Sequence, residues 1–117
     1  MAIERIETNK RLSEAVIHGD TVYLCGQVAD NLTGDVQAQT RETLANIDKM
    51  LARAGTDKSR LLSATVYLKT IADYKPLNEV WDAWTAPGAS PARTCVAGVV
   101  LYSPDALVEI TVVAAKG

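Results

Sequence analysis

The segment Leu107–Ala114 most constrains the fold, because it is apolar on both of its faces. Its sequence, "LVEITVVA", interrupts the apolar residues only at Glu109 and Thr111. A strand with one face in water alternates apolar and polar residues, whereas a strand of this composition is typical of burial on both sides. We therefore expect a central strand, and a cover over each face of the sheet that contains it.

Two helices are predicted, and they would cover one of those faces. Residues 36–54 carry apolar side chains at helical spacing, with Asp35 placed to cap the helix and Gly55 to end it. The second helix begins near Asp73, with Pro76 in its first turn. Its apolar stripe recurs at i, i+3, i+4 and i+7 and consists of Leu77, Val80, Trp81 and Trp84.

Five strands are predicted around these helices. Two lie at Ala15–Ile17 and Thr21–Cys25, and a third, "RLLSATVYLK", has Leu62, Ala64, Val66 and Leu68 on one face. The last two, Arg93–Val100 and Leu107–Ala114, are joined by "SPDA", a turn that predicts an antiparallel hairpin. The order β-β-α-β-α-β-β predicts an α+β fold with both helices on one face of the sheet.

The length of the chain limits what can cover the other face. A chain of 117 residues is expected to form one domain, residues 1–117, with one core. The two predicted helices cover one face of the sheet and leave the second face open. Another copy of the same chain would cover it most simply, so we expect an oligomer.

Composition argues against several classes of partner. The net charge of −2 gives no basic surface for nucleic acid. No segment approaches the roughly 20 apolar residues that span a bilayer, and the N-terminus lacks the apolar run of a signal peptide, so we expect a cytoplasmic protein without a membrane partner. Cys25 and Cys95 are expected to stay reduced, and the spacing of Cys and His residues offers no metal site.

Arg93 is the candidate functional residue, because a guanidinium in the apolar stretch "SPARTCVAGVV" needs a partner. The predicted hairpin would place Arg93 or Cys95 near Glu109 or Thr111. One interpretation is an Arg93–Glu109 ion pair that fixes register or an oligomer contact. The other is an anion site, because the planar guanidinium matches a carboxylate. Cys95 alone is typical of a small buried apolar residue.

Four stretches together resemble the RidA/YjgF group, the reactive intermediate deaminases. They are "YLCGQVA", "TGDVQAQTRETLANIDKMLARAG", "ATVYLKTIADYKPLNEVWDAW" and "SPARTCVAGVVLYSPDALVEITVVA". The last is the most specific in combination, since it includes Pro91, Arg93, Cys95 and Glu109. The resemblance implies the fold of the small trimeric chorismate mutases, with three sheets packed into a barrel and clefts between subunits.

The resemblance also implies an activity. Members with the arginine hydrolyse 2-imino acids, or their enamine tautomers, to 2-keto acids and ammonia, without cofactor or metal. In this chain Arg93 would hold the substrate carboxylate, Glu109 would orient water or relay a proton, and groups at Cys95 would hold the water or the ammonia. Gly26, Thr65 and Asn78 match family positions with supporting roles.

One departure from the family bears on function. Many members carry a cleft tyrosine before the first hairpin, where this chain has Leu12 and Ser13 in "RLSEAV". The alternatives are therefore a non-catalytic module that binds a 2-keto acid or a similar carboxylate, and a chorismate mutase. The latter binds a dianion and would want a second cation, for which Lys69 is the nearest candidate by pattern.

Overall fold

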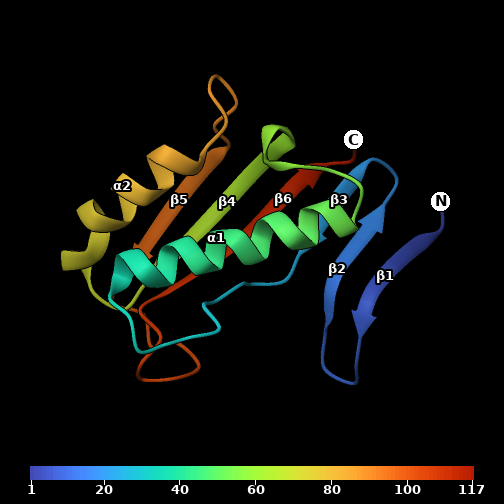
Figure 1. The fold of residues 1–117 in the computed structure, drawn as a ribbon. Helices are drawn as coiled ribbons and strands as arrows, with labels where there is room; N and C mark the ends of the chain where they lie inside the picture. The colour runs from blue at the N-terminus through green and yellow to red at the C-terminus, as the bar shows by residue number, and fades with distance from the viewer.

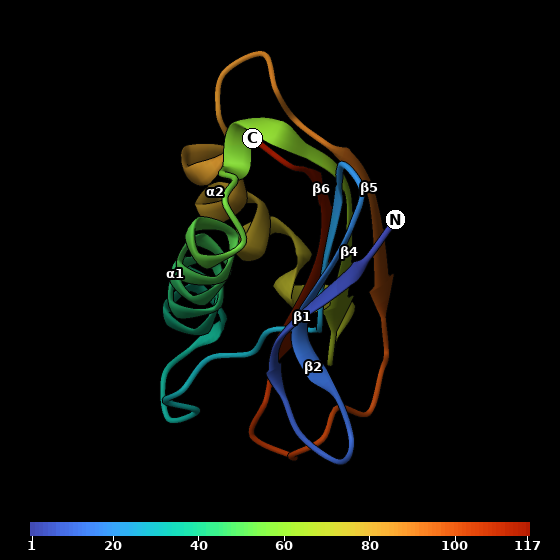
Figure 2. The same cartoon turned by 90° about the vertical axis from the view of Figure 1, so that its right-hand side faces the viewer.

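The chain forms a single six-stranded sheet with both helices on one side. In the computed structural model, which describes residues 1–117, Figure 1 shows the helices lying across the sheet, and the edge-on view of Figure 2 shows its other side without a covering layer. The strands are β1 (Ile3–Thr8), β2 (Ser13–His18), β3 (Thr21–Leu24), β4 (Leu61–Leu68), β5 (Ala92–Ala97) and β6 (Val108–Ala115). The predicted α+β class and the placement of both helices on one face are confirmed.

The strand β6 lies in the middle of the sheet, as its apolar sequence predicts. The strand order is β1-β2-β3-β6-β4-β5, and β6 pairs antiparallel with both β3 and β4. Its side chains toward the helices, Val108, Ile110, Val112 and Ala114, are fully buried. Those on the opposite side, which we call the open face, are only half-buried, so a single chain covers only one side of this strand.

The helix α1 (Val36–Arg53) begins and ends where the sequence predicts. Asp35 caps it by accepting a hydrogen bond from the Ala38 amide at 2.9 Å. After the last turn Gly55 adopts a φ of 81°, a left-handed conformation that costs glycine little. Leu44, Ile47 and Leu51 bury one side of α1 in the core.

The helix α2 (Tyr74–Trp84) lies at the β5 end of the sheet in Figure 1. A 3-10 turn, Ile71–Asp73, leads into it, and Thr70 caps that turn. Asp73 occupies the N-cap position of α2 without a capping hydrogen bond from its side chain. Leu77 and Trp81 are buried, so the predicted stripe does face the core.

Three predictions about the strands are wrong. The strand β1 was not expected; it pairs only with β2 and is almost wholly exposed, so it has no core face to mark its sequence. In β4 the register shifts between Leu61 and Ser63, and Leu62 is exposed rather than on the core face. The last two strands form no hairpin: β4 lies between β5 and β6, and β5 runs parallel to β4.

Candidate functional site

The edge strand β5 presents Arg93 and Cys95 to the helix layer. Arg93 lies opposite Ala64 of β4, and Cys95 lies opposite Val66. Both β4 partners are core residues, and burial alternates along β5 with the odd-numbered residues inward. Arg93 therefore lies at the margin of the core, where β5 leaves the sheet edge open.

The Arg93 guanidinium is held by aromatic rings from α2 rather than by a carboxylate. Its central carbon lies 5.2 Å from the centroid of the Trp81 ring and 5.8 Å from that of Tyr74. Nη2 donates a long hydrogen bond of 3.5 Å to the Tyr74 hydroxyl. Each cation–π contact of this kind contributes on the order of 1 kcal/mol. The rings hold the guanidinium in place but leave its charge without a counter-ion.

Two polar atoms near this position are buried without a hydrogen-bond partner, namely Nη1 of Arg93 and Oδ1 of Asn78. Asn78 follows Tyr74 by four residues and precedes Trp81 by three, so it shares the α2 face that meets Arg93. Asn78, to which the resemblance gives a supporting role, thus has its side-chain carbonyl oxygen buried. A buried donor and a buried acceptor left unpaired each cost about 1–3 kcal/mol. A ligand or a second chain would relieve that cost.

Glu109 lies in a separate pocket on the open face, which we call the acidic pocket. Glu109 is directly opposite Tyr67 of β4, and Gly26 comes so close that a methyl group there would overlap the Glu109 carboxylate. The pocket has a volume of about 410 Å³. Its lining includes one carboxylate and no cation, and consists of Gly26, Tyr67, Val99, Val100, Leu101, Tyr102, Glu109 and Thr111.

Cys25 lies beside this pocket in a small polar cluster that the sequence did not single out. Its thiol donates to Oε2 of Glu14 at 3.2 Å, and the Gln27 amide donates to the same oxygen at 3.2 Å. Burial, and then the hydrogen bond to and the charge of Glu14, raise the pKa of the Cys25 thiol to about 11. Cys25 is therefore a protonated thiol at neutral pH and a weak nucleophile.

Cys95 is likewise not activated. Burial raises the pKa of its thiol above the ordinary value, and the nearby charge of Arg93 offsets part of that rise. His18, the single histidine, is exposed beside the β2–β3 turn. Both cysteines are free. The region around Arg93 therefore lacks the thiolate and base that nucleophilic catalysis requires.

The structure brings Arg93 and Cys95 together but does not bring Glu109 to them within one chain. Glu109 shares the open face with Tyr67 and Thr111, whereas Arg93 faces the helices. The one ion pair in the chain joins Arg53 and Glu7 at 3.1 Å. An intrachain Arg93–Glu109 pair is therefore excluded, and a site that uses both residues requires two chains.

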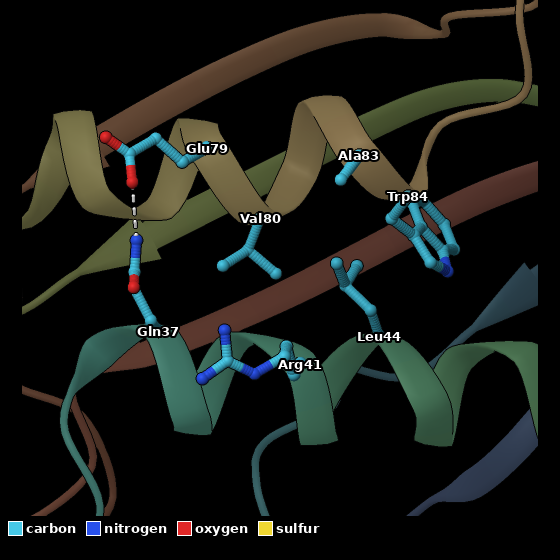
Figure 3. Close-up of a pocket in the computed structure, with 7 residues that line it drawn as sticks. All are labelled: Gln37, Arg41, Leu44, Glu79, Val80, Ala83 and Trp84. Atoms are coloured by element: carbon cyan, nitrogen blue, oxygen red, sulfur yellow. Dashed lines mark hydrogen bonds between the residues drawn. The ribbon is translucent and has the colours of Figure 1, made fainter.

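A second hollow, between α1 and α2, contains none of the predicted residues. Figure 3 shows Val80 and Leu44 pointing into the gap between the helices, with Gln37 reaching across to Glu79 at one end. That contact is a hydrogen bond of 2.8 Å from the Gln37 amide. Arg41 is the single cation along this groove, and neither Arg41 nor Glu79 is buried. The groove thus lacks the desolvated charge found at Arg93.

Comparison with known proteins agrees with this arrangement. A family model described as Endoribonuclease L-PSP matches residues 2–116. The chain is 43% identical over 115 residues to the RutC family protein YoaB of Escherichia coli (strain K12), covering 98% of this chain and 99% of that protein. It is 43% identical over 113 residues to a RutC family protein of Haemophilus ducreyi, covering 97% and 96%.

Solved structures give the same result for the fold. A YjgF-family protein from Neisseria meningitidis superimposes with a TM-score of 0.94 at 43% identity, over 100% of this chain and 97% of that one. An uncharacterized protein from Pseudomonas aeruginosa gives 0.95 at 46% identity, over 99% and 100%. Sequence and fold agree along the whole chain, which therefore belongs to the YjgF/RutC family.

Proposed function

We propose that this protein hydrolyses 2-imino acids, or their enamine tautomers, to 2-keto acids and ammonia. The observation that carries the proposal is the Arg93 guanidinium, which is partly buried, has one nitrogen without a partner and meets no carboxylate in its own chain. A charge retained under these conditions needs an anion from outside the chain. A substrate carboxylate would supply that anion.

Arg93 is suited to orient such a substrate. Its planar fork can pair with both oxygens of a carboxylate, and partial removal from water strengthens that pairing. The Tyr74 and Trp81 rings limit the positions that the guanidinium can take. Once the carboxylate is fixed, the adjacent C=N carbon is fixed as well, and this positioning lowers the entropic part of the barrier.

The remaining chemistry needs a water molecule and one proton carrier. The oxygen of water bonds to the carbon of the protonated imine, while the C=N π electrons move to nitrogen and one water proton passes to the Glu109 carboxylate. Glu109 then returns that proton to the nitrogen, which leaves as ammonia as the C–N bond breaks, while the hydroxyl passes its proton to the Glu109 carboxylate to form the ketone. No covalent intermediate with the enzyme is needed, which accords with two unactivated cysteines.

Because Arg93 and Glu109 lie on opposite faces of one sheet, the proposed site spans two chains. The open edge of β5 in one subunit would meet the open face of its neighbour, and three such contacts would close a homotrimer. This arrangement would cover the second face of β6, whose composition predicts burial. In it Cys95 lies beside Arg93 at the cleft, where its backbone or thiol would hold the water or the departing ammonia.

Replacement of Arg93 tests this proposal. An amino-acid oxidase or a dehydratase generates iminopropionate or iminobutyrate in situ, and ammonia release is followed with and without the protein. We expect Arg93→Ala to lower kcat/KM about 100-fold or more, since the carboxylate loses its anchor. Arg41→Ala, which removes an exposed guanidinium between the helices, is the matched control and should keep full activity. An Arg93→Ala protein as active as wild type, in the same oligomeric state, would sink the assignment.

A non-catalytic carboxylate-binding module is the second candidate. It is favoured by one observation: Leu12 and Ser13, the best-matching positions for the tyrosine found in many family members, offer no phenolic hydroxyl. A module of this kind would bind 2-ketobutyrate saturably in calorimetry, with binding lost in Arg93→Ala, and would not accelerate imine hydrolysis. Faster imine hydrolysis in the presence of the wild-type protein than in its absence would favour the enzyme over the binding module.

A further inference from the structure

The three hydroxyl groups of the acidic pocket differ in exposure and in whether they already make a hydrogen bond within the chain. The Thr111 hydroxyl donates a hydrogen bond to the Leu24 carbonyl at 3.1 Å, so it has no hydrogen left to donate to a ligand. Tyr102 is 68% exposed on the loop that follows β5. Tyr67 is half-buried on β4, and none of the side-chain hydrogen bonds in the structure engages its hydroxyl. Among the hydroxyl groups of the acidic pocket, that of Tyr67 is thus the one that is both held by the sheet and without a hydrogen-bond partner.

Tyr67 also has a fixed relation to Glu109. The two residues are direct partners in the antiparallel β4–β6 ladder, and such partners place their Cβ atoms about 4.5–5.5 Å apart on the same face. Both side chains line the acidic pocket. The backbone of two central strands sets this pairing, so it does not depend on a mobile loop.

We propose that Tyr67 is the water-positioning residue of this site, an inference that rests on the proposed hydrolase function. A water molecule between the two side chains would donate one hydrogen bond to the Glu109 carboxylate and a second hydrogen bond to the Tyr67 oxygen. Its lone pair is then directed at the C=N carbon. The phenolic hydrogen of Tyr67 remains available to the other Glu109 oxygen, so each polar group in the trio has a partner.

In this role Tyr67 would supply a phenolic hydroxyl to a site that lacks the cleft tyrosine of many family members. Leu12 and Ser13 provide no phenol near the cleft, whereas β4 provides one directly beside the carboxylate. Proton transfer remains with Glu109: when water adds, its proton goes to the carboxylate and the Tyr67 hydroxyl keeps its own. Tyr67 orients the reacting water and does not exchange a proton with it.

The Tyr67→Phe protein tests the inference, because it removes one oxygen and keeps the ring. Imine hydrolysis should lose about 10-fold or more in kcat, with KM nearly unchanged because Arg93 still binds the substrate.

Tyr23→Phe is the matched control, since Tyr23 also lies on a strand of the sheet but is exposed and outside the pocket. It should match wild type in kcat and in KM. A Tyr67→Phe protein with wild-type kcat, or with a loss confined to KM, would overturn the role of Tyr67 while leaving the hydrolase function intact. A wild-type protein that does not accelerate hydrolysis would overturn both.

Discussion

Gly26 and Glu109 show how one missing methyl group shapes the site. A Cβ at Gly26 would overlap Oε2 of Glu109 and lie 3.1 Å from its Cδ. The atoms that would have to move are at the end of a flexible side chain. The absence of a side chain at residue 26 therefore sets where the carboxylate lies rather than whether the sheet forms.

Gly26→Ala should accordingly separate activity from stability. We expect the Glu109 carboxylate to be displaced and kcat to fall about 10-fold or more, since catalytic groups act only within a narrow range of positions. The free energy of unfolding should change by less than about 1 kcal/mol, because Gly26 has no positive φ that alanine would strain. Ammonia release and urea unfolding measure the two quantities. A loss of stability that parallels the loss of activity would contradict this account.

At the residue scale, the sequence identifies Arg93 as a candidate functional residue but does not indicate which residues surround the site. A charge in an apolar strand is visible in the sequence, and so is its need for a partner. The Tyr67–Glu109 pairing depends on the register between β4 and β6, which no local pattern encodes. The burial of the Asn78 carbonyl depends likewise on how α2 lies on β5.

At the scale of elements, Gln39 ties α1 to the segment before β6. It is buried, and its Nε2 lies 3.2, 3.1 and 3.0 Å from the carbonyls of Leu32, Gly34 and Asp105, which share its two amide hydrogens. Its Oε1 accepts from the Leu107 amide at 3.0 Å. One side chain thus satisfies backbone groups from two loops that lie far apart in the sequence.

Gln39→Leu should therefore destabilise the fold by about 3 kcal/mol, since four backbone groups lose their partner at about 1 kcal/mol each, partly offset by the apolar replacement. Gln37→Leu is the matched control: Gln37 lies two residues away and binds Glu79 and the Pro76 carbonyl at the surface, and its loss should cost less than about 1 kcal/mol. Urea unfolding at one fixed protein concentration compares them. Equal losses would show that Gln39 is not the link.

The predictions about elements succeed where a strong local signal exists. Asp35 and Gly55 mark the ends of α1, and the apolar stripe marks the buried side of α2. They fail for β1, which is an exposed edge strand without apolar periodicity. They also fail for β5 and β6, because the turn residues at Pro104 resemble a hairpin while a longer loop, beginning at Gly98 with φ of 76°, takes β6 past β4.

At the scale of the whole molecule, the sheet remains covered on one side only. The molecule is thin, with extents of 43 × 37 × 20 Å, as expected for one helix layer on one sheet. Tyr23, Leu62 and Val96 are exposed apolar side chains on its strands. Neither helix combines the length and apolar character that crossing a bilayer requires. A second copy of the chain remains our proposal for the cover.

The apolar patterns of the strands predict that something covers the open face of the sheet. They do not encode how a second copy of the chain would pack against that face. The hairpin predicted for the last two strands would place Arg93 and Glu109 in one site of a single chain. The actual topology separates them onto opposite faces, so the proposed site, which uses both residues, would lie between two chains.

Mixing two inactive variants tests this central claim most directly. Arg93→Ala and Glu109→Gln chains are unfolded together in equal amounts, refolded and assayed for imine hydrolysis, with each variant refolded alone as the control. If every site takes Arg93 from one chain and Glu109 from another, random assembly restores both residues at about one quarter of the sites. We predict that the mixture recovers about one quarter of wild-type activity, while each variant alone stays inactive. A mixture as inactive as its two components would contradict the account.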